Sequence, residues 1–96
     1  MRDLELRKQV AIACGHTDFT IDEYGLRYKN LVFVPKYELS IDAIAAEFDK
    51  KGWDWDLERY TSQKRVEYIA VSPLIDYSNS ELTGAIALCK LFLELN

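Results

Sequence analysis

The sequence predicts a small α+β domain in which about three helices pack on a short antiparallel sheet that contains a central hairpin. Apolar residues recur with helical spacing in three stretches of the chain, and they alternate with charged residues in a fourth stretch. The order is helix, long loop, helix, hairpin, helix, which is an α+β layout. The 96 residues form one domain, 1–96, because a chain of this length buries roughly 60% of its unfolded surface in a single core.

Each predicted helix has apolar residues on one face. The repeats are Leu6, Val10 and Ala13; Ile41, Ile44, Ala45 and Phe48; and Leu82, Ala85, Ile86, Cys89, Phe92 and Leu93. Gly15 is expected to end the first helix, while Ser40 and Gly52 stand where the N-cap and the terminating glycine of the second helix belong. The third helix is expected to begin after Ser78, which forms a capping-box pattern with Glu81.

The hairpin is predicted from a stretch in which large apolar residues alternate with carboxylates. The apolar positions are Trp53, Trp55 and Leu57, and the carboxylates are Asp54, Asp56 and Glu58, which we call the acidic triplet. A polar turn over residues 61–64 leads to a second alternating strand that starts at Val66 and ends near residues 72–73, and residues 72–79 are predicted to form a polar loop.

The acidic triplet has two interpretations. Carboxylates spaced ~6.5–7 Å along one strand face could act as an acid–base pair or hold a hard cation. Neighbouring Arg59, Lys64 and Arg65 would keep them ionised, so the sequence favours a solvated strand face that is available to a partner.

Residues 15–40 keep no helical period, and their glycine, asparagine and proline residues predict a long loop. Within that loop, residues 31–34 are rich in β-branched and aromatic side chains, which predicts a short edge strand or extended segment. The loop region also carries four aromatic residues, which either anchor a partner or ligand or cover the edge of the sheet: Tyr24, Tyr28, Phe33 and Tyr37.

Charge and cysteine content limit the function classes. A formal net charge of −4 argues against nucleic-acid binding, which needs a basic surface. Cys14, His16 and Cys89 do not complete a zinc pattern, so no metal or other cofactor is expected, and two cysteines within apolar helical patterns favour a reducing compartment such as the cytoplasm. The charged N-terminus lacks a signal-peptide pattern, and no apolar run is long enough to predict a membrane span.

Three segments resemble a known family. These are YELSIDAI at residues 37–44, the pair Gly52 and Trp53, and ELTGAIALCK at residues 81–90. Together they look like the phage ABA-sandwich domain family, small proteins of phages and prophages whose shared pattern is a packing signature without a catalytic motif. The resemblance covers residues 35–95 and implies a sandwich of helices and sheet in a protein that works in the cytoplasm of a bacterial host.

No nucleophile elbow, phosphate-binding glycine loop or paired CxxC occurs, so no enzymatic activity is expected. The leading hypothesis is a non-enzymatic phage accessory protein that binds a host or phage protein, for example to inhibit a defence system, through the loop aromatics and the acidic triplet. The alternative is a module that sequesters a nucleotide-like small ligand on the loop aromatics. An exposed edge over residues 31–34 would also allow a homodimer.

Overall fold

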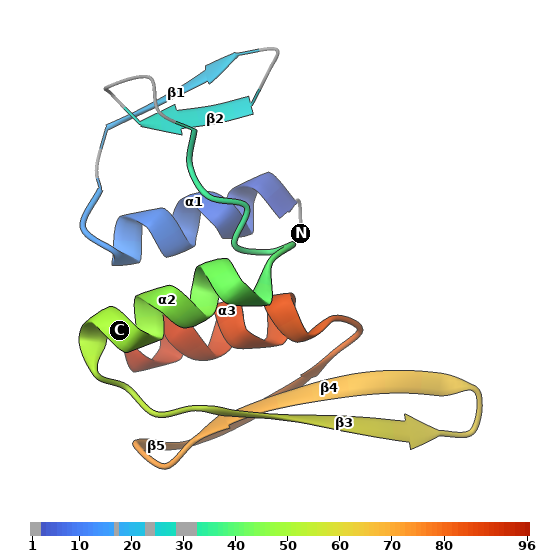
Figure 1. Ribbon diagram of the computed structural model, residues 1–96. Coiled ribbons are helices and arrows are strands. Elements are labelled where there is room, and N and C mark those ends of the chain that lie inside the picture. The colour runs from blue at the N-terminus through green and yellow to red at the C-terminus, as the bar shows by residue number, and fades with distance from the viewer. Residues whose placement is uncertain (1–2, 17, 23–24, 29–32) are drawn as a thin grey trace.

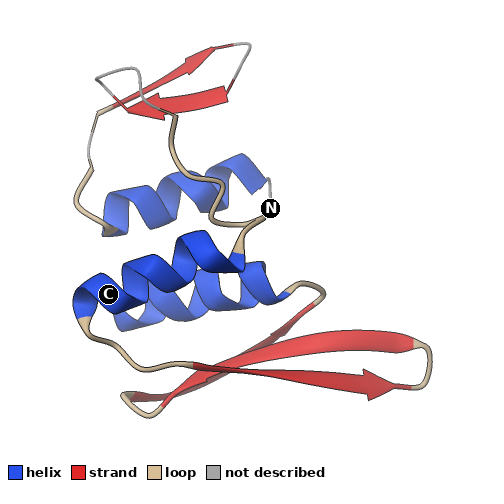
Figure 2. Ribbon diagram, in the orientation of Figure 1, coloured by secondary structure: helices blue, strands red, loops and turns tan. Residues whose placement is uncertain are grey.

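The computed structural model describes residues 3–16, 18–22, 25–28 and 33–96, and it shows three helices and two antiparallel sheets. The elements are α1 (Asp3–Ala13), β1 (Phe19–Asp22), β2 (Gly25–Tyr28), α2 (Ile41–Lys51), β3 (Asp56–Ser62), β4 (Arg65–Ser72), β5 (Ile75–Glu81) and α3 (Gly84–Leu95). The helices lie between the two sheets, with β1 and β2 at one end of the molecule and β3, β4 and β5 at the other (Figures 1 and 2). The predicted α+β fold with a central hairpin is confirmed.

The core is built around α3, which contacts α1, α2, β4 and β5. Leu88, Leu91 and Phe92 of this helix are fully buried. Phe92 also meets Phe48 of α2 edge to face, with ring centroids 5.3 Å apart. Because such pairs stabilise beyond the area that they bury, this contact fixes α2 against α3.

The ends of α2 are those that the sequence predicts. The Ser40 hydroxyl accepts a hydrogen bond from the backbone N–H of Ala43 at 3.2 Å, and Gly52 ends the helix in the left-handed region with φ +69°. By contrast, the predicted capping box of Ser78 and Glu81 is wrong, because both residues belong to β5. Helix α3 begins later, after Thr83, whose hydroxyl accepts from the N–H of Ile86.

The three-stranded sheet has the order β3-β4-β5. The predicted β3–β4 hairpin is present, with Glu58 opposite Ile69, but β5 occupies most of the stretch predicted as a polar loop. This strand was missed because its polar residues are stabilised by tertiary contacts. Asn79, for example, donates its side-chain amide to the carbonyl of Ala87 in α3 at 3.2 Å.

The segment 15–40 is not a plain loop, because β1 and β2 form a short hairpin within it. Residues 31 and 32 of the predicted edge strand lie outside the described residues. Phe33 forms an isolated bridge with Arg27, and the N–H of Val34 donates to the carbonyl of Leu26 at 3.0 Å. The chain after residue 32 is thus held against β2.

Candidate functional site

The helices cover one face of the three-stranded sheet, and within the described part of the chain the other face carries no further layer (Figure 1). Leu57 and Tyr68 pack against the core, and Ala70 is fully buried. Because strand side chains alternate between faces, their neighbours point away from the helices. We call this the outer sheet face, and its residues are Asp56, Glu58 and Tyr60 of β3, Arg65, Glu67, Ile69 and Val71 of β4, and Ser80 of β5.

The pairing of β3 with β4 places carboxylates beside aliphatic side chains on the outer sheet face. Asp56 lies opposite Val71, and Glu58 lies opposite Ile69. Both aliphatic residues are half-buried, whereas both carboxylates are exposed. The arrangement is an apolar strip with an acidic border, which suits contact with a protein surface better than chemistry on a small substrate.

All three residues of the acidic triplet are exposed, as predicted, but the strand begins only at Asp56, so Asp56 and Glu58 share the strand face and Asp54 does not. Asp54 precedes β3, Asp56 accepts a hydrogen bond from the N–H of Leu57 at 2.9 Å, and Glu58 accepts one from the hydroxyl of Tyr60 at 3.2 Å. These contacts are local and leave the carboxylates in solvent, outside any pocket that would bring a substrate to them. The triplet has the geometry of a contact surface.

The β3–β4 hairpin extends beyond the helices (Figure 1). Gln63 and Lys64 form its turn, and Gln63 adopts a left-handed φ of 54°. Arg59 and Thr61 are exposed near the tip, although the strand pattern points them toward the helix side. This part of the hairpin therefore lies outside the core, and its side chains contribute little to folding.

The four aromatic residues singled out in the sequence do not form one surface. Tyr24 lies outside the described residues. Tyr28 is half-buried against His16, with ring centroids 4.2 Å apart. Phe33 is 52% exposed, whereas Tyr37 is only 2% exposed and belongs to the core. The expectation that Tyr37 contributes to a partner surface is wrong, because its side chain is buried and its hydroxyl donates to a carboxylate of α2.

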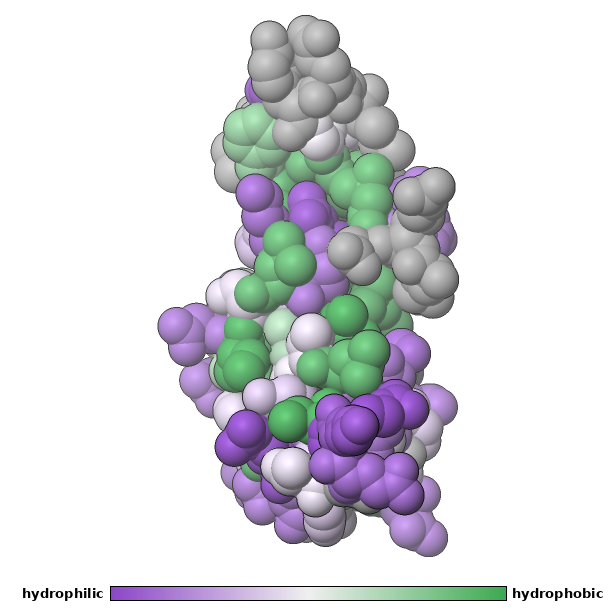
Figure 3. Space-filling view, turned by 90° about the vertical axis from the view of Figure 1, so that its right-hand side faces the viewer, coloured by the Kyte–Doolittle hydropathy of each residue, from purple (hydrophilic) through white to green (hydrophobic). Residues whose placement is uncertain are grey.

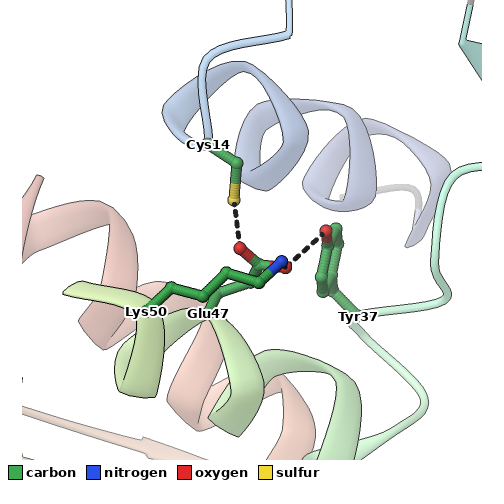
Figure 4. A network of polar contacts seen from close by, with 4 residues as sticks. All are labelled: Cys14, Tyr37, Glu47 and Lys50. Atoms are coloured by element: carbon green, nitrogen blue, oxygen red, sulfur yellow. Dashed lines mark hydrogen bonds and ion pairs between the residues drawn. The ribbon is translucent and has the colours of Figure 1, made fainter. Parts of the chain in front are cut away.

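That carboxylate belongs to Glu47 of α2, which sits at the centre of a polar network (Figure 4). Its carboxylate accepts hydrogen bonds from the Tyr37 hydroxyl at 3.2 Å and from the Cys14 thiol at 3.4 Å. Lys50 lies 3.3 Å away and pairs with one carboxylate oxygen. Glu47 was not predicted as a site residue, although its position directly before buried Phe48 indicates that it lies at the edge of the apolar stripe of α2.

The network makes Cys14 a poor nucleophile. Burial, followed by the charge and hydrogen bond of Glu47, raises the pKa of the Cys14 thiol to about 12. Burial likewise raises the pKa of Tyr37. A thiol with such a pKa stays protonated at neutral pH, and only the thiolate attacks electrophiles. His16, two residues farther along the chain, is exposed and stacks against Tyr28.

A patch of exposed apolar residues lies where α2 and α3 begin. Leu39, Ile41 and Leu82 are exposed there. The two helix starts are adjacent, because a Cβ placed on Gly84 would come 3.1 Å from Cδ1 of Ile41. Figure 3, which views this end of the molecule, shows apolar groups gathered between the hairpin turn and the β1–β2 end.

Among the described residues, no group of three or more His, Cys, Asp or Glu side chains is placed to hold a metal ion. None of the described helices has the length and apolar character needed to cross a membrane. Comparison of the chain with protein-family models, with curated proteins and with solved structures finds no match. Function therefore has to be argued from the surfaces described above.

Proposed function

We propose that this protein is a non-enzymatic binding protein whose outer sheet face docks on a basic surface of another protein. The observation that carries the proposal is the acidic border of Asp56 and Glu58 beside half-buried Ile69 and Val71, on a sheet face that no other described part of the chain covers. The aliphatic strip supplies area that can be removed from water on binding. The carboxylates supply the charge complementarity that selects and orients a partner.

The net charge supports a basic partner. A chain with a formal charge of −4 attracts a cationic surface over distances of about one Debye length, which is ~10 Å at 0.1 M salt. Such attraction raises the association rate more than the lifetime of the complex. Proteins that handle nucleic acids carry basic surfaces of this kind, so they are the class of partner that the outer sheet face fits.

The resemblance to the phage ABA-sandwich family gives this binding a biological setting. In that setting the protein is a phage or prophage accessory protein, and its partner is a host or phage protein in the bacterial cytoplasm. Inhibition of a host defence system is the role that we propose, because many defence proteins act on nucleic acids through a basic surface that an acidic protein can occupy.

The test is affinity capture of the tagged protein from a bacterial host lysate, beside a variant in which Asp54, Asp56 and Glu58 are changed to lysine. The proposal expects a specific partner that the wild type captures and the variant does not. The complex should also weaken as the salt concentration rises, because exposed charges are screened.

A matched control separates the outer sheet face from net charge. Changing Glu5, Asp49 and Glu94 to lysine alters the charge by the same amount at exposed carboxylates of the helices. The control variant should capture the partner as the wild type does. Equal loss of the partner in both variants would show that net charge alone drives capture, and the outer sheet face would then have no special role.

A further inference from the structure

A cavity of about 340 Å³ lies between α1 and the segment that follows β2. The residues that line it are Arg7, Phe33, Val34, Pro35 and Lys36. Its volume is at the lower end of the range for small-molecule sites, which run from ~300 to ~1,000 Å³. The cavity is separate from the outer sheet face, which belongs to the sheet at the opposite end of the molecule (Figure 1).

The lining combines apolar walls with positive charge. Val34 and Pro35 provide aliphatic surface, and Phe33 provides a ring that is 52% exposed. Among the described residues of the lining, the charged ones are Arg7 and Lys36, and both are cationic although the chain as a whole is acidic. An occupant that matches these walls is flat and aromatic on one side and negatively charged on the other.

The position of the Phe33 ring is fixed by contacts with β2. The guanidinium of Arg27 lies over it, 4.2 Å from the ring centroid. The bridge between Arg27 and Phe33, and the hydrogen bond from Val34 to Leu26, tie the same segment to β2. A ring that is already fixed loses little conformational entropy when a planar group stacks on it.

Arg7 is fixed as well. Its Nε donates to Oε1 of Glu38 at 2.9 Å, and its Nη2 donates to the second carboxylate oxygen of the same residue. The Glu38 side chain is completely buried, whereas Lys36 is exposed at the cavity. The buried ion pair therefore shapes the wall, and Lys36 is the residue that can reach a charged ligand directly.

We propose that this cavity binds a nucleotide, with the base stacked on Phe33 and the phosphate at Lys36. Stacking on an aromatic ring accepts any base, and an ammonium group is a common partner of phosphate. The inference goes beyond protein binding, and it uses none of the residues of the outer sheet face.

The experiment measures binding of adenosine 5′-monophosphate to the full-length chain by calorimetry and by the shift in melting temperature. Adenosine and inorganic phosphate serve as the two partial probes. A ligand that binds only the native state raises the melting temperature in a concentration-dependent way. We expect adenosine monophosphate to do so, and each partial probe to bind at least tenfold more weakly.

Two variants and two controls test the assignment of the site. Phe33→Ala and Lys36→Glu should each weaken binding roughly 5- to 150-fold, since one stacked base or one charged contact is worth ~1–3 kcal/mol. Leu74→Ala removes an apolar side chain of similar exposure, 51%, and Lys64→Glu makes the same charge change in the β3–β4 turn. Both controls should bind like the wild type.

Several results would overturn the inference. One is the absence of saturable binding of adenosine monophosphate. Another is equal affinity for inorganic phosphate, because the ring would then contribute nothing, and a third is equal affinity for adenosine, because the cation would then contribute nothing. Unchanged affinity in both cavity variants would place the site elsewhere. None of these outcomes depends on whether the outer sheet face binds a protein.

Discussion

The ion pair between Arg7 and Glu38 links α1 to the segment before α2, and removing one partner should destabilise the fold strongly. The Glu38 side chain has 0% exposure and that of Arg7 has 13%. Arg7→Met leaves a buried carboxylate without its cation, a change that typically costs 3–5 kcal/mol. Domains of this kind unfold with a total of ~5–15 kcal/mol, so the variant should lose a large fraction of its stability.

The reverse change should cost less. Glu38→Leu removes the buried charge and leaves Arg7, whose partly exposed guanidinium can turn toward water along its flexible stem. We expect a loss of about 1–3 kcal/mol, the range for an unsatisfied polar group. The double variant Arg7→Met with Glu38→Leu places apolar groups of similar size against each other. It should lie within ~1–2 kcal/mol of the wild type, because well-packed apolar residues often replace a buried ion pair without loss.

The assay is urea denaturation followed by circular dichroism and by the fluorescence of Trp53 and Trp55, with the free energy of unfolding compared across the four proteins of the cycle. The sum of the two stability losses in the single variants should exceed the stability loss in the double variant by several kcal/mol. If the double variant instead lost the sum of the two single losses, the pair would be uncoupled. If Glu38→Leu cost more than Arg7→Met, the reasoning from burial would be wrong.

Four further predictions concern helix ends and thiols. Replacing Ser40 or Thr83 with alanine removes an N-cap and should cost about 1 kcal/mol each, seen as a fall in melting temperature of roughly 4–8 °C. Gly52→Ala should cost roughly 1–2 kcal/mol because φ is +69° and no atom lies near the added methyl group, and Gly52→Asn should cost less. Burial raises the pKa of both Cys14 and Cys89 from 9.0 to about 12. Near pH 8 the folded protein therefore holds about a thousandfold less thiolate than the unfolded chain. Because only the thiolate attacks, the folded protein should react with a disulfide reagent correspondingly slowly. The same shift stabilises the fold fully below pH 9, and this contribution should be lost between pH 9 and pH 12, where the unfolded chain releases protons that the folded one retains.

Helix α2 could be predicted nearly to the residue because its determinants are local. Ser40 caps it, Gly52 ends it, and its apolar stripe has the helical period. Strand β5 and the true start of α3 could not be predicted in this way. Polar residues such as Asn79 become part of a strand only because their backbone pairs with β4 and their side chains find partners in α3. The carbonyl of Ala87, for example, accepts the hydrogen bond of the Asn79 amide.

For the candidate sites, too, features set by local sequence could be predicted, and features set by tertiary contacts could not. The alternation of apolar and acidic residues was enough to predict that the acidic triplet lies in solvent, because side chains two residues apart on a strand share a face. It was not enough to find Ile69 and Val71 beside them, since that contact depends on the register between two strands. Tyr37 was misplaced for a related reason. Its carboxylate partner, Glu47, is ten residues away on another element, and only the fold brings the two together.

This molecule carries negative charge on one surface and positive charge at another, and the formal net charge of −4 does not reveal this separation. Asp56 and Glu58 border the outer sheet face, while Lys36 lies at the cavity beside α1, where buried Glu38 balances the charge of Arg7. If each surface has its own ligand, raising the salt concentration should weaken the binding of both ligands. A charge reversal at one surface should leave the affinity of the other surface unchanged, because exposed charges farther apart than ~10 Å are largely screened. Coupling between the two surfaces would require the helix layer to shift. The edge-to-face contact of Phe48 with fully buried Phe92 resists such a shift, because close-packed cores do not deform continuously.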